Sequence, residues 1–236
     1  MRKFKDFDLR DGSVIEAIPT VGLLSTIASS YIIGSLELDQ IAALESEAFP
    51  SVSMIYARKP KFPARIYARE DLKLAAFISE VPMPAGIHRP LARTLLDWAR
   101  NQAAREIVCL EGLPIAEGPD EPDLWGVGST KRARQRLKDS GIEQLEIGMI
   151  PGVSGVLLNE GRWVKFDVIC LVAETRAVIP DAMAAARLVE AVDKLLPHMT
   201  IPTEPLVEQA EKIQEHLAAV QQQAKPAMEP ALDIYR

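Results

Sequence analysis

Short apolar runs alternate with segments of helical periodicity along the first 200 residues. Runs with the length and composition of strands lie at 13–18, 41–45, 65–69, 72–80, 106–111, 124–128, 145–149 and 166–174. Apolar positions that recur every three or four residues predict helices at 21–32, 88–104, 131–139, 153–159 and 181–196. We therefore expect an α/β fold with a mostly parallel sheet, flanked by helices on both faces.

The pattern changes after residue 200. A polar helix is predicted over 201–223, with a narrow apolar seam at Leu206, Ile213, Leu217 and Val220. Such a seam is typical of a helix that pairs with another helix, either in a second copy or in its own domain. Residues 224–236 show no periodicity and predict a flexible tail. The expected organisation is an α/β core at 1–200, a C-terminal helix at 201–223 and a tail at 224–236.

Charge and cysteine content narrow the functional classes. The 236 residues carry a net charge of −6, which argues against nucleic acid or an anionic membrane as the main partner. The uncharged stretch at 17–36 is long enough for a membrane span, but its proline, glycines, serines and threonines favour a buried strand end and a core helix. Cys109 and Cys170 lie inside apolar runs, as reduced thiols of a cytoplasmic protein do.

Candidate catalytic and metal-binding residues are sparse. The histidines are far apart, and no Cys-x-x-Cys or His-Glu-x-x-His motif occurs, so we predict no metal site. The segment 152–156 resembles a nucleophile elbow around Ser154 but lacks its final glycine. We therefore predict neither catalytic residues nor a cofactor.

A glycine-rich turn gives one candidate anion site. Its residues are Gly126, Gly128, Ser129, Thr130 and Lys131, placed between a predicted strand and a predicted helix. Backbone N–H groups at a helix N-terminus attract anions, but the residue order differs from that of a P-loop. The basic side chains of the following helix spread over more than one face, which is typical of a solvated surface.

Three predicted strands end in glutamate, at Glu80, Glu111 and Glu174. Ligands of open parallel sheets bind at the carboxyl ends of the strands. If these acids cluster there, each raises the pKa of the others and could serve in acid–base chemistry. The alternative, which we favour, is that the strands simply leave the core through a polar residue.

The end of the chain carries the most specific signal. Ile234, Tyr235 and Arg236 form a hydrophobic residue, a penultimate tyrosine and a terminal residue with a free carboxylate. A tyrosine offers apolar area and one hydroxyl, and a carboxylate can pair with a lysine in a pocket. The pattern predicts a peg that docks into a partner. The alternative is a frayed terminus without a role.

The layout resembles the archaeal members of the proteasome assembly chaperone family. The resemblance rests on 14–19, Gly22, the hairpin near 66–80, and 148–158 followed by 166–175. The last three residues are similar to the hydrophobic–tyrosine–any motif with which proteasome activators grip pockets between α-ring subunits. The resemblance implies a phosphorylase-like α/β fold without phosphorylase activity, and a homo-oligomer that presents several tails to proteasome α-subunits.

The sequence thus predicts a non-catalytic proteasome-binding protein, either an assembly chaperone or an activator. Two other classes stay open. One is a phosphorylase- or ligase-like enzyme that acts on a phosphorylated small molecule at the turn 126–131 and the strand-end glutamates. The other is a structural oligomer whose tail has no function.

Overall fold

The strands form one large sheet and one separate hairpin. The computed structural model describes residues 1–236 except 20, 116–121, 176–180, 203–207, 209–211 and 213–236. Its strands are β1 (Arg2–Lys3), β2 (Ser13–Ala17), β3 (Asp39–Leu44), β4 (Met54–Tyr56), β5 (Lys59–Lys61), β6 (Ala64–Arg69), β7 (Leu74–Ser79), β8 (Glu106–Pro114), β9 (Leu124–Gly128) and β10 (Asp167–Thr175). Its α-helices are α1 (Leu24–Ser35), α2 (His88–Asn101), α3 (Lys131–Asp139), α4 (Gly152–Val164) and α5 (Ala182–Leu195).

The large sheet has a parallel centre and antiparallel edges. Its order is β1-β3-β6-β7-β2-β8-β10-β9. The four central strands β7, β2, β8 and β10 run parallel. β6, β3 and β1 continue the sheet antiparallel on one side, and β9 does so on the other. The predicted α/β fold is confirmed, and the middles of β8 and β10 are apolar runs because helices cover both faces of the sheet.

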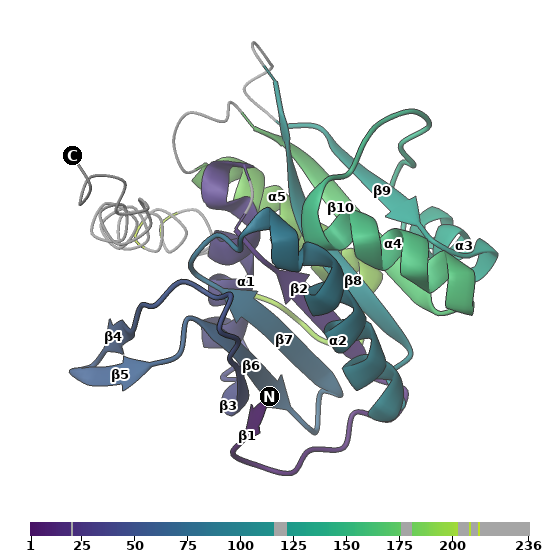
Figure 1. The fold of residues 1–236 in the computed structure, drawn as a ribbon. Coiled ribbons are helices and arrows are strands. Elements are labelled where there is room, and N and C mark those ends of the chain that lie inside the picture. The colour runs from purple at the N-terminus through teal and green to yellow at the C-terminus, as the bar shows by residue number, and fades with distance from the viewer. Residues whose placement is uncertain (20, 116–121, 176–180, 203–207, 209–211, 213–236) are drawn as a thin grey trace, which may run out of the picture.

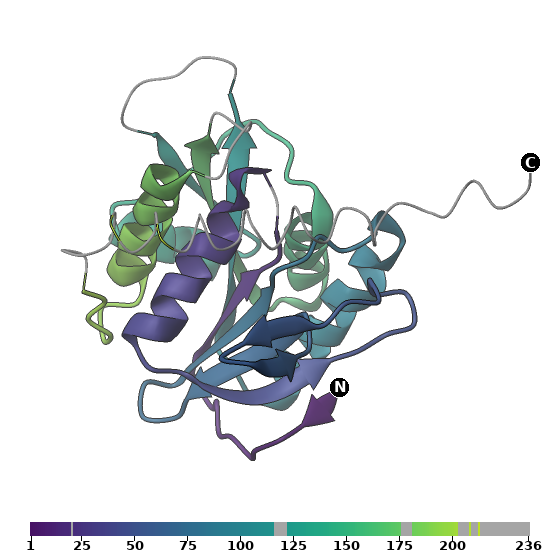
Figure 2. The same ribbon diagram turned by 90° about the vertical axis from the view of Figure 1, so that its left-hand side faces the viewer.

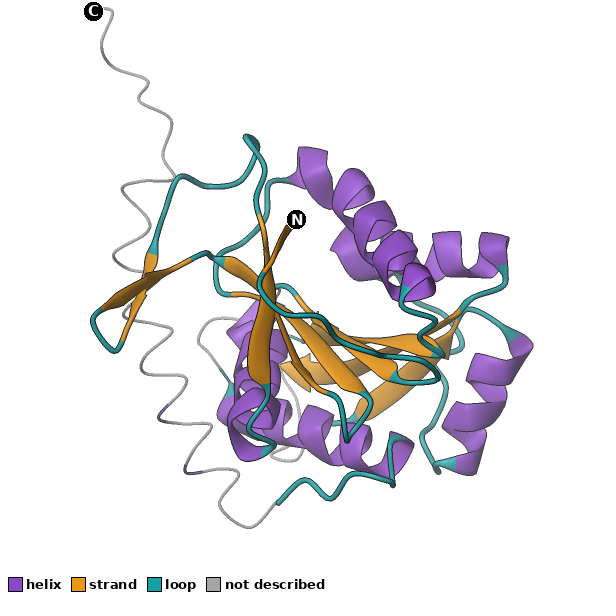
Figure 3. Cartoon of the chain, turned by 90° about the horizontal axis from the view of Figure 1, so that it is seen from below, coloured by secondary structure: helices purple, strands orange, loops and turns teal. Residues whose placement is uncertain are grey.

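The helices form one layer on each face of the sheet (Figures 1 and 3). α1 packs against α5 on one face, and α2 packs against α4 on the other. Alternate residues of β10 point to opposite layers: Ile169 and Leu171 join the core beneath α1 and α5, whereas Val168 and Cys170 join the core beneath α2 and α4. We refer to these as the α1–α5 face and the α2–α4 face.

Two predicted helix starts are fixed by side-chain caps. The Oγ1 of Thr130 accepts a hydrogen bond of 3.0 Å from the backbone N–H of Ala133 at the start of α3. The carboxylate of Asp181 accepts one of 3.0 Å from Ala184 at the start of α5. Each cap satisfies a backbone donor that has no partner inside the helix, which stabilises the helix end by about 1 kcal/mol.

The predicted strand at 145–149 is wrong. Only Gln144 forms an isolated bridge, to Gly126 of the edge strand β9. The apolar side chains that suggested a strand do not reach the core, since Ile147 is 92% exposed and Met149 is 84% exposed. After this single bridge, residues 145–151 lead to α4, which extends five residues beyond the predicted helix end at 159, to Val164.

The hairpin of β4 and β5 was missed by the sequence analysis. It projects beyond the large sheet in Figure 1 and faces the viewer in Figure 2. Its turn places Ala57 and Arg58 at φ values of 48° and 64°, a conformation usually supplied by Asn or Gly. The turn therefore lacks its usual residue signal, and Pro60 further weakens the appearance of a strand.

Candidate functional site

The predicted docking motif and helix seam lie outside the described residues. Ile234, Tyr235 and Arg236 are among these, as are the seam residues Leu206, Ile213, Leu217 and Val220. Of residues 201–223, the structure describes Ile201, Pro202, Glu208 and Lys212, and the exposed side chains of Glu208 and Lys212 form an ion pair of 2.6 Å one helical turn apart. The motif and the seam stay predictions.

The glycine-rich turn joins β9 tightly to α3. A Cβ atom on Gly126 would lie 2.3 Å from Leu137 Cδ2, and one on Gly128 would lie 2.7 Å from the backbone nitrogen of Arg134. A larger residue at 128 would require the backbone of α3 to move, and one at 126 would displace the buried side chain of Leu137. The glycines therefore have a packing role that is independent of any anion.

The hydroxyls of the same turn are engaged within the protein. Ser129 Oγ donates to the carbonyl of Phe166 at 3.0 Å and accepts from the backbone N–H of Val168 at 2.8 Å. Thr130 Oγ1 donates to the carboxylate of Asp167 at 2.5 Å, in addition to capping α3. These contacts give both residues a structural role, and the anion site at 126–131 stays a prediction.

Two arginines of α3 do not follow the expectation of a wholly solvated helix surface. Arg132 pairs with Asp167, and Arg136 pairs with Glu106. Both carboxylates are almost fully buried at the amino ends of β10 and β8. The arginines compensate buried negative charge, which would otherwise be costly in the interior.

The strand-end glutamates do not form one cluster. Glu80 follows β7 and lines a cavity beside α1, on the α1–α5 face. Glu111 lies two residues after Cys109 on β8, so its side chain points to the α2–α4 face. Glu174 accepts a hydrogen bond of 3.3 Å from the backbone of Asp123 near the end of β10. The sheet thus separates Glu80 from Glu111.

Glu80 instead forms a buried ion pair with Arg65. Arg65 Nη2 lies 2.7 Å from Glu80 Oε1, and the two side chains are 2% and 4% exposed. Tyr56 donates its hydroxyl to the same carboxylate oxygen, and Arg65 Nη1 donates to the carbonyl of Phe62 at 2.7 Å. Within the described part of the chain, Arg65 Nε and Glu80 Oε2 are buried without a hydrogen-bond partner. The pair is thus only partly satisfied.

Aromatic rings complete the surroundings of this ion pair. The Arg65 guanidinium carbon lies 5.4 Å from the ring centroid of Tyr56 and 5.7 Å from that of Tyr67. Burial, followed by the negative charge of Glu80, raises the pKa of Tyr56, so its hydroxyl stays protonated at neutral pH. The tyrosine of the projecting hairpin is therefore held to the strands of the sheet.

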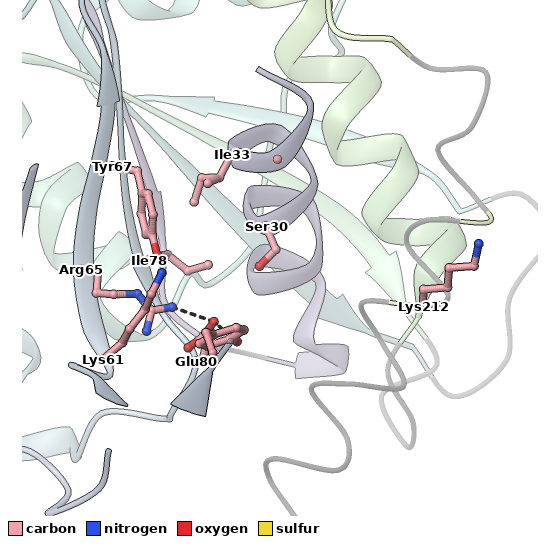
Figure 4. A pocket seen from close by; sticks show the side chains of 10 residues that line it. Ser30, Ile33, Lys61, Arg65, Tyr67, Ile78, Glu80 and Lys212 are labelled. Atoms are coloured by element: carbon pink, nitrogen blue, oxygen red, sulfur yellow. Dashed lines mark hydrogen bonds and ion pairs between the residues drawn. The ribbon is translucent and has the colours of Figure 1, made fainter. Parts of the chain in front are cut away.

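A cavity of about 330 Å³ adjoins the ion pair. Its walls come from α1, from the hairpin and from the strands β6 and β7, as Figure 4 shows. The lining residues are Ser30, Ile33, Gly34, Tyr56, Lys61, Arg65, Tyr67, Ile78, Glu80 and Lys212. We call this space the hairpin cavity. Its volume falls in the range of small-molecule sites.

The amino-acid sequence carries only a weak signal for this site. Arg65, Tyr67 and Arg69 alternate with the apolar Ile66 and Ala68 along β6. This period of two predicts a strand with one polar face toward solvent. Only the fold shows that the polar face is covered at Arg65.

A second buried polar group lies on the α2–α4 face. Glu16 of β2 is 2% exposed, and Ser154 near the start of α4 donates a hydrogen bond of 2.8 Å to its Oε2. Burial raises the pKa of Glu16 to about 7, although the hydrogen bonds from Ser154 and Cys109 oppose the shift. Ser154 is only 1% exposed, so its hydroxyl serves the core rather than a substrate.

Among the residues that the structure describes, no group of three or more His, Cys, Asp or Glu side chains is placed to hold a metal ion. Over the same residues, none of the helices combines the length and apolar character needed to cross a bilayer.

The parallel-centred sheet with a helix layer on each face defines an α/β protein of the PAC2 fold. The chain belongs to the PAC2 family, which it matches over residues 14–221. It is 30% identical over 210 residues to the protein MJ0106 of Methanocaldococcus jannaschii, covering 89% of this chain and 85% of that protein.

Two solved structures from Pyrococcus furiosus are similar over nearly their whole length. PbaA, described as an archaeal homologue of proteasome-assembly chaperone, has a TM-score of 0.85 and 28% identity, covering 94% of this chain and 97% of its own. PbaB, described as an archaeal proteasome activator, has a TM-score of 0.76 and 25% identity, covering 93% and 97%. The similarity thus spans the whole α/β core.

Proposed function

We propose that this chain is a non-catalytic protein that binds the α-ring of the proteasome, as an assembly chaperone or an activator. Its similarity to PbaA and PbaB, together with the terminal residues Ile234, Tyr235 and Arg236, supports this proposal. The descriptions of the two relatives both concern the proteasome, and the C-terminal sequence offers a means of docking. The observation that carries the proposal is the combination of a PAC2 core with this terminus.

In the proposed docking mode, each terminal residue has its own role. Ile234 packs at the mouth of a pocket between α-subunits, Tyr235 fills the pocket, and the carboxylate of Arg236 pairs with a basic side chain. A single three-residue peg binds weakly because it buries little surface. A homo-oligomer that presents several pegs to one ring gains avidity of about 10² to 10⁴.

The test is a pull-down of recombinant proteasome α-subunits by the full chain and by a chain without residues 234–236. We expect binding by the full chain alone. A sharper variant adds one alanine after Arg236, which keeps all side chains but moves the carboxylate by one residue; it should also lose binding. Leu232→Ala, outside the motif, is the matched control and should still bind.

Two outcomes would contradict the proposal. Equal binding by the full and shortened chains would show that the tail is not the docking element. Failure of every variant to bind, including the full chain, would exclude the α-ring as the partner. Chaperone and activator roles are then separated by measuring α-ring assembly from subunits and peptide hydrolysis by mature proteasomes.

A further inference from the structure

Three hydrogen-bond donors around the hairpin cavity have no hydrogen-bond or ion-pair partner among the described residues. Among the described residues, the ammonium of Lys61 forms no ion pair, and the hydroxyls of Ser30 and Tyr67 form no hydrogen bond. Lys61 Nζ instead lies over the rings of Tyr56 and Tyr67, at 5.6 and 5.9 Å from their centroids. Figure 4 shows Lys61 and Tyr67 on one side of the cavity and Ser30 on the other. Free hydrogen-bond donors therefore face the cavity from both sides.

The charges of the residues that line the cavity favour a ligand with one negative charge. Arg65 is neutralised by Glu80 at 2.7 Å, and the ammonium of Lys212 pairs with Glu208 at 2.6 Å. Lys61 is left as the one uncompensated charge among the described residues that line the cavity. A cationic ligand would be repelled by Lys61, and a dianion would keep one charge unpaired in a partly buried site.

The rest of the lining is apolar. Ile33 of α1 and Ile78 of β7 form part of the wall, and the tyrosine rings add flat apolar surface. Ligand sites commonly combine such a lining with a few polar groups that fix the orientation of the ligand. The cavity thus matches a molecule with an apolar body and one anionic end.

We propose that the hairpin cavity binds a small monocarboxylate with an apolar or aromatic body. Lys61 and the hydroxyls of Tyr67 and Ser30 receive the carboxylate, and Ile33 and Ile78 contact the body. Because Lys61 belongs to β5, Tyr67 to β6 and Ser30 to α1, the ligand joins the projecting hairpin to the core. The proposed contacts do not involve the docking residues Ile234, Tyr235 and Arg236, and the proposal does not depend on proteasome binding.

Benzoate is the first probe, with benzamide as its neutral counterpart of the same shape. Isothermal titration calorimetry of the full chain should give saturable binding of one benzoate, with a Kd on the order of millimolar. Benzamide should bind at least about tenfold more weakly, because a charge-assisted hydrogen bond is replaced by a neutral one. Equal binding of benzoate and benzamide, or no saturable binding of benzoate, overturns the proposal.

Matched variants locate the binding. Lys61→Met should weaken benzoate binding about tenfold or more. The control Lys59→Met removes the same charge from an exposed position on the same strand and should leave benzoate binding unchanged. Ile33→Trp should fill the cavity and abolish binding, with Ile55→Trp on the exposed hairpin face as its control. Unchanged benzoate affinity in Lys61→Met overturns the proposal. Because Lys61 is partly exposed, this variant should fold, and the test holds even if the protein does not tolerate Ile33→Trp.

Limited proteolysis tests whether the ligand joins the hairpin to the core, without a measurement of binding affinity. The hairpin turn exposes Arg58, and we expect benzoate to slow tryptic cleavage after this residue by tying the hairpin to the core. Benzamide at the same concentration should have little effect. Equal cleavage rates with and without benzoate contradict the bridging role of the ligand.

Discussion

The guanidinium of Arg65 and the carboxylate of Glu80 meet at 2.7 Å, with both side chains almost completely removed from solvent. The two residues lie on neighbouring antiparallel segments, in β6 and just after β7. Their contact joins the antiparallel edge of the sheet to the base of the projecting hairpin, whose Tyr56 donates to the same carboxylate. The pair is therefore both a stability element and one wall of the hairpin cavity.

Removal of one partner of this pair should be strongly destabilising. Arg65→Met leaves Glu80 buried without its counter-charge, and we expect a loss of about 3–5 kcal/mol in the free energy of unfolding. Urea unfolding followed by circular dichroism measures the loss. The double variant Arg65→Met with Glu80→Leu removes both charges and should lose clearly less than Arg65→Met alone. If the loss in the double variant equals the sum of the losses in Arg65→Met and in Glu80→Leu, each measured alone, the two charges are not coupled.

The buried Glu16 should make stability fall as the pH rises. Its pKa is raised from 4.5 in the unfolded chain to about 7 in the folded protein. Between these values the folded state holds a proton that the unfolded state has released, so the free energy of unfolding decreases with pH. The loss amounts to about 3 kcal/mol and is complete above pH 7.

Comparison with Glu16→Gln isolates this effect from other titrating groups. The variant keeps the shape and the hydrogen bond with Ser154 but cannot ionise. Unfolding free energies of both proteins from pH 4.5 to 8 should diverge, with the natural protein losing stability relative to the variant. Parallel curves would show that Glu16 titrates with an ordinary pKa.

Gly126 should not tolerate alanine. Its Cβ would lie 2.3 Å from Leu137 Cδ2, and Leu137 is completely buried, so either this side chain leaves its packed position or β9 and α3 separate. We expect a loss of about 1–3 kcal/mol in thermal or urea unfolding. Gly34→Ala is the control: nothing lies within 4 Å of its Cβ, and alanine favours the helix by up to about 1 kcal/mol. A tolerated alanine at 126 would show that the strand–helix contact is looser than described.

The role of the predicted seam of the C-terminal helix can be tested by measuring the molecular mass of the protein in solution. If Leu206, Ile213, Leu217 and Val220 hold copies together, the double change Ile213→Asp with Leu217→Asp should dissociate the oligomer, because two charges enter an apolar contact. Size-exclusion chromatography with light scattering measures the change. An unchanged mass would assign the seam to a contact within one chain.

The sequence alone determined the class of fold and most elements of the core. Unbroken apolar runs at β8 and β10 predicted strands covered on both faces, and the structure bears this out. Helix starts were readable where a local residue fixes them, as Asp181 does for α5. Local periodicity and capping carry this information because they depend on neighbours within a few residues.

Only the tertiary structure decided which polar residues meet. Arg65 and Glu80 are 15 positions apart, and Glu16 meets Ser154 across 138 positions, so no local pattern could pair them. The same holds for segment 145–149, which resembles a strand but keeps Ile147 and Met149 exposed because only Gln144 bridges to the edge strand β9. The strand order sets burial and partners at these positions, and that order depends on contacts between distant segments.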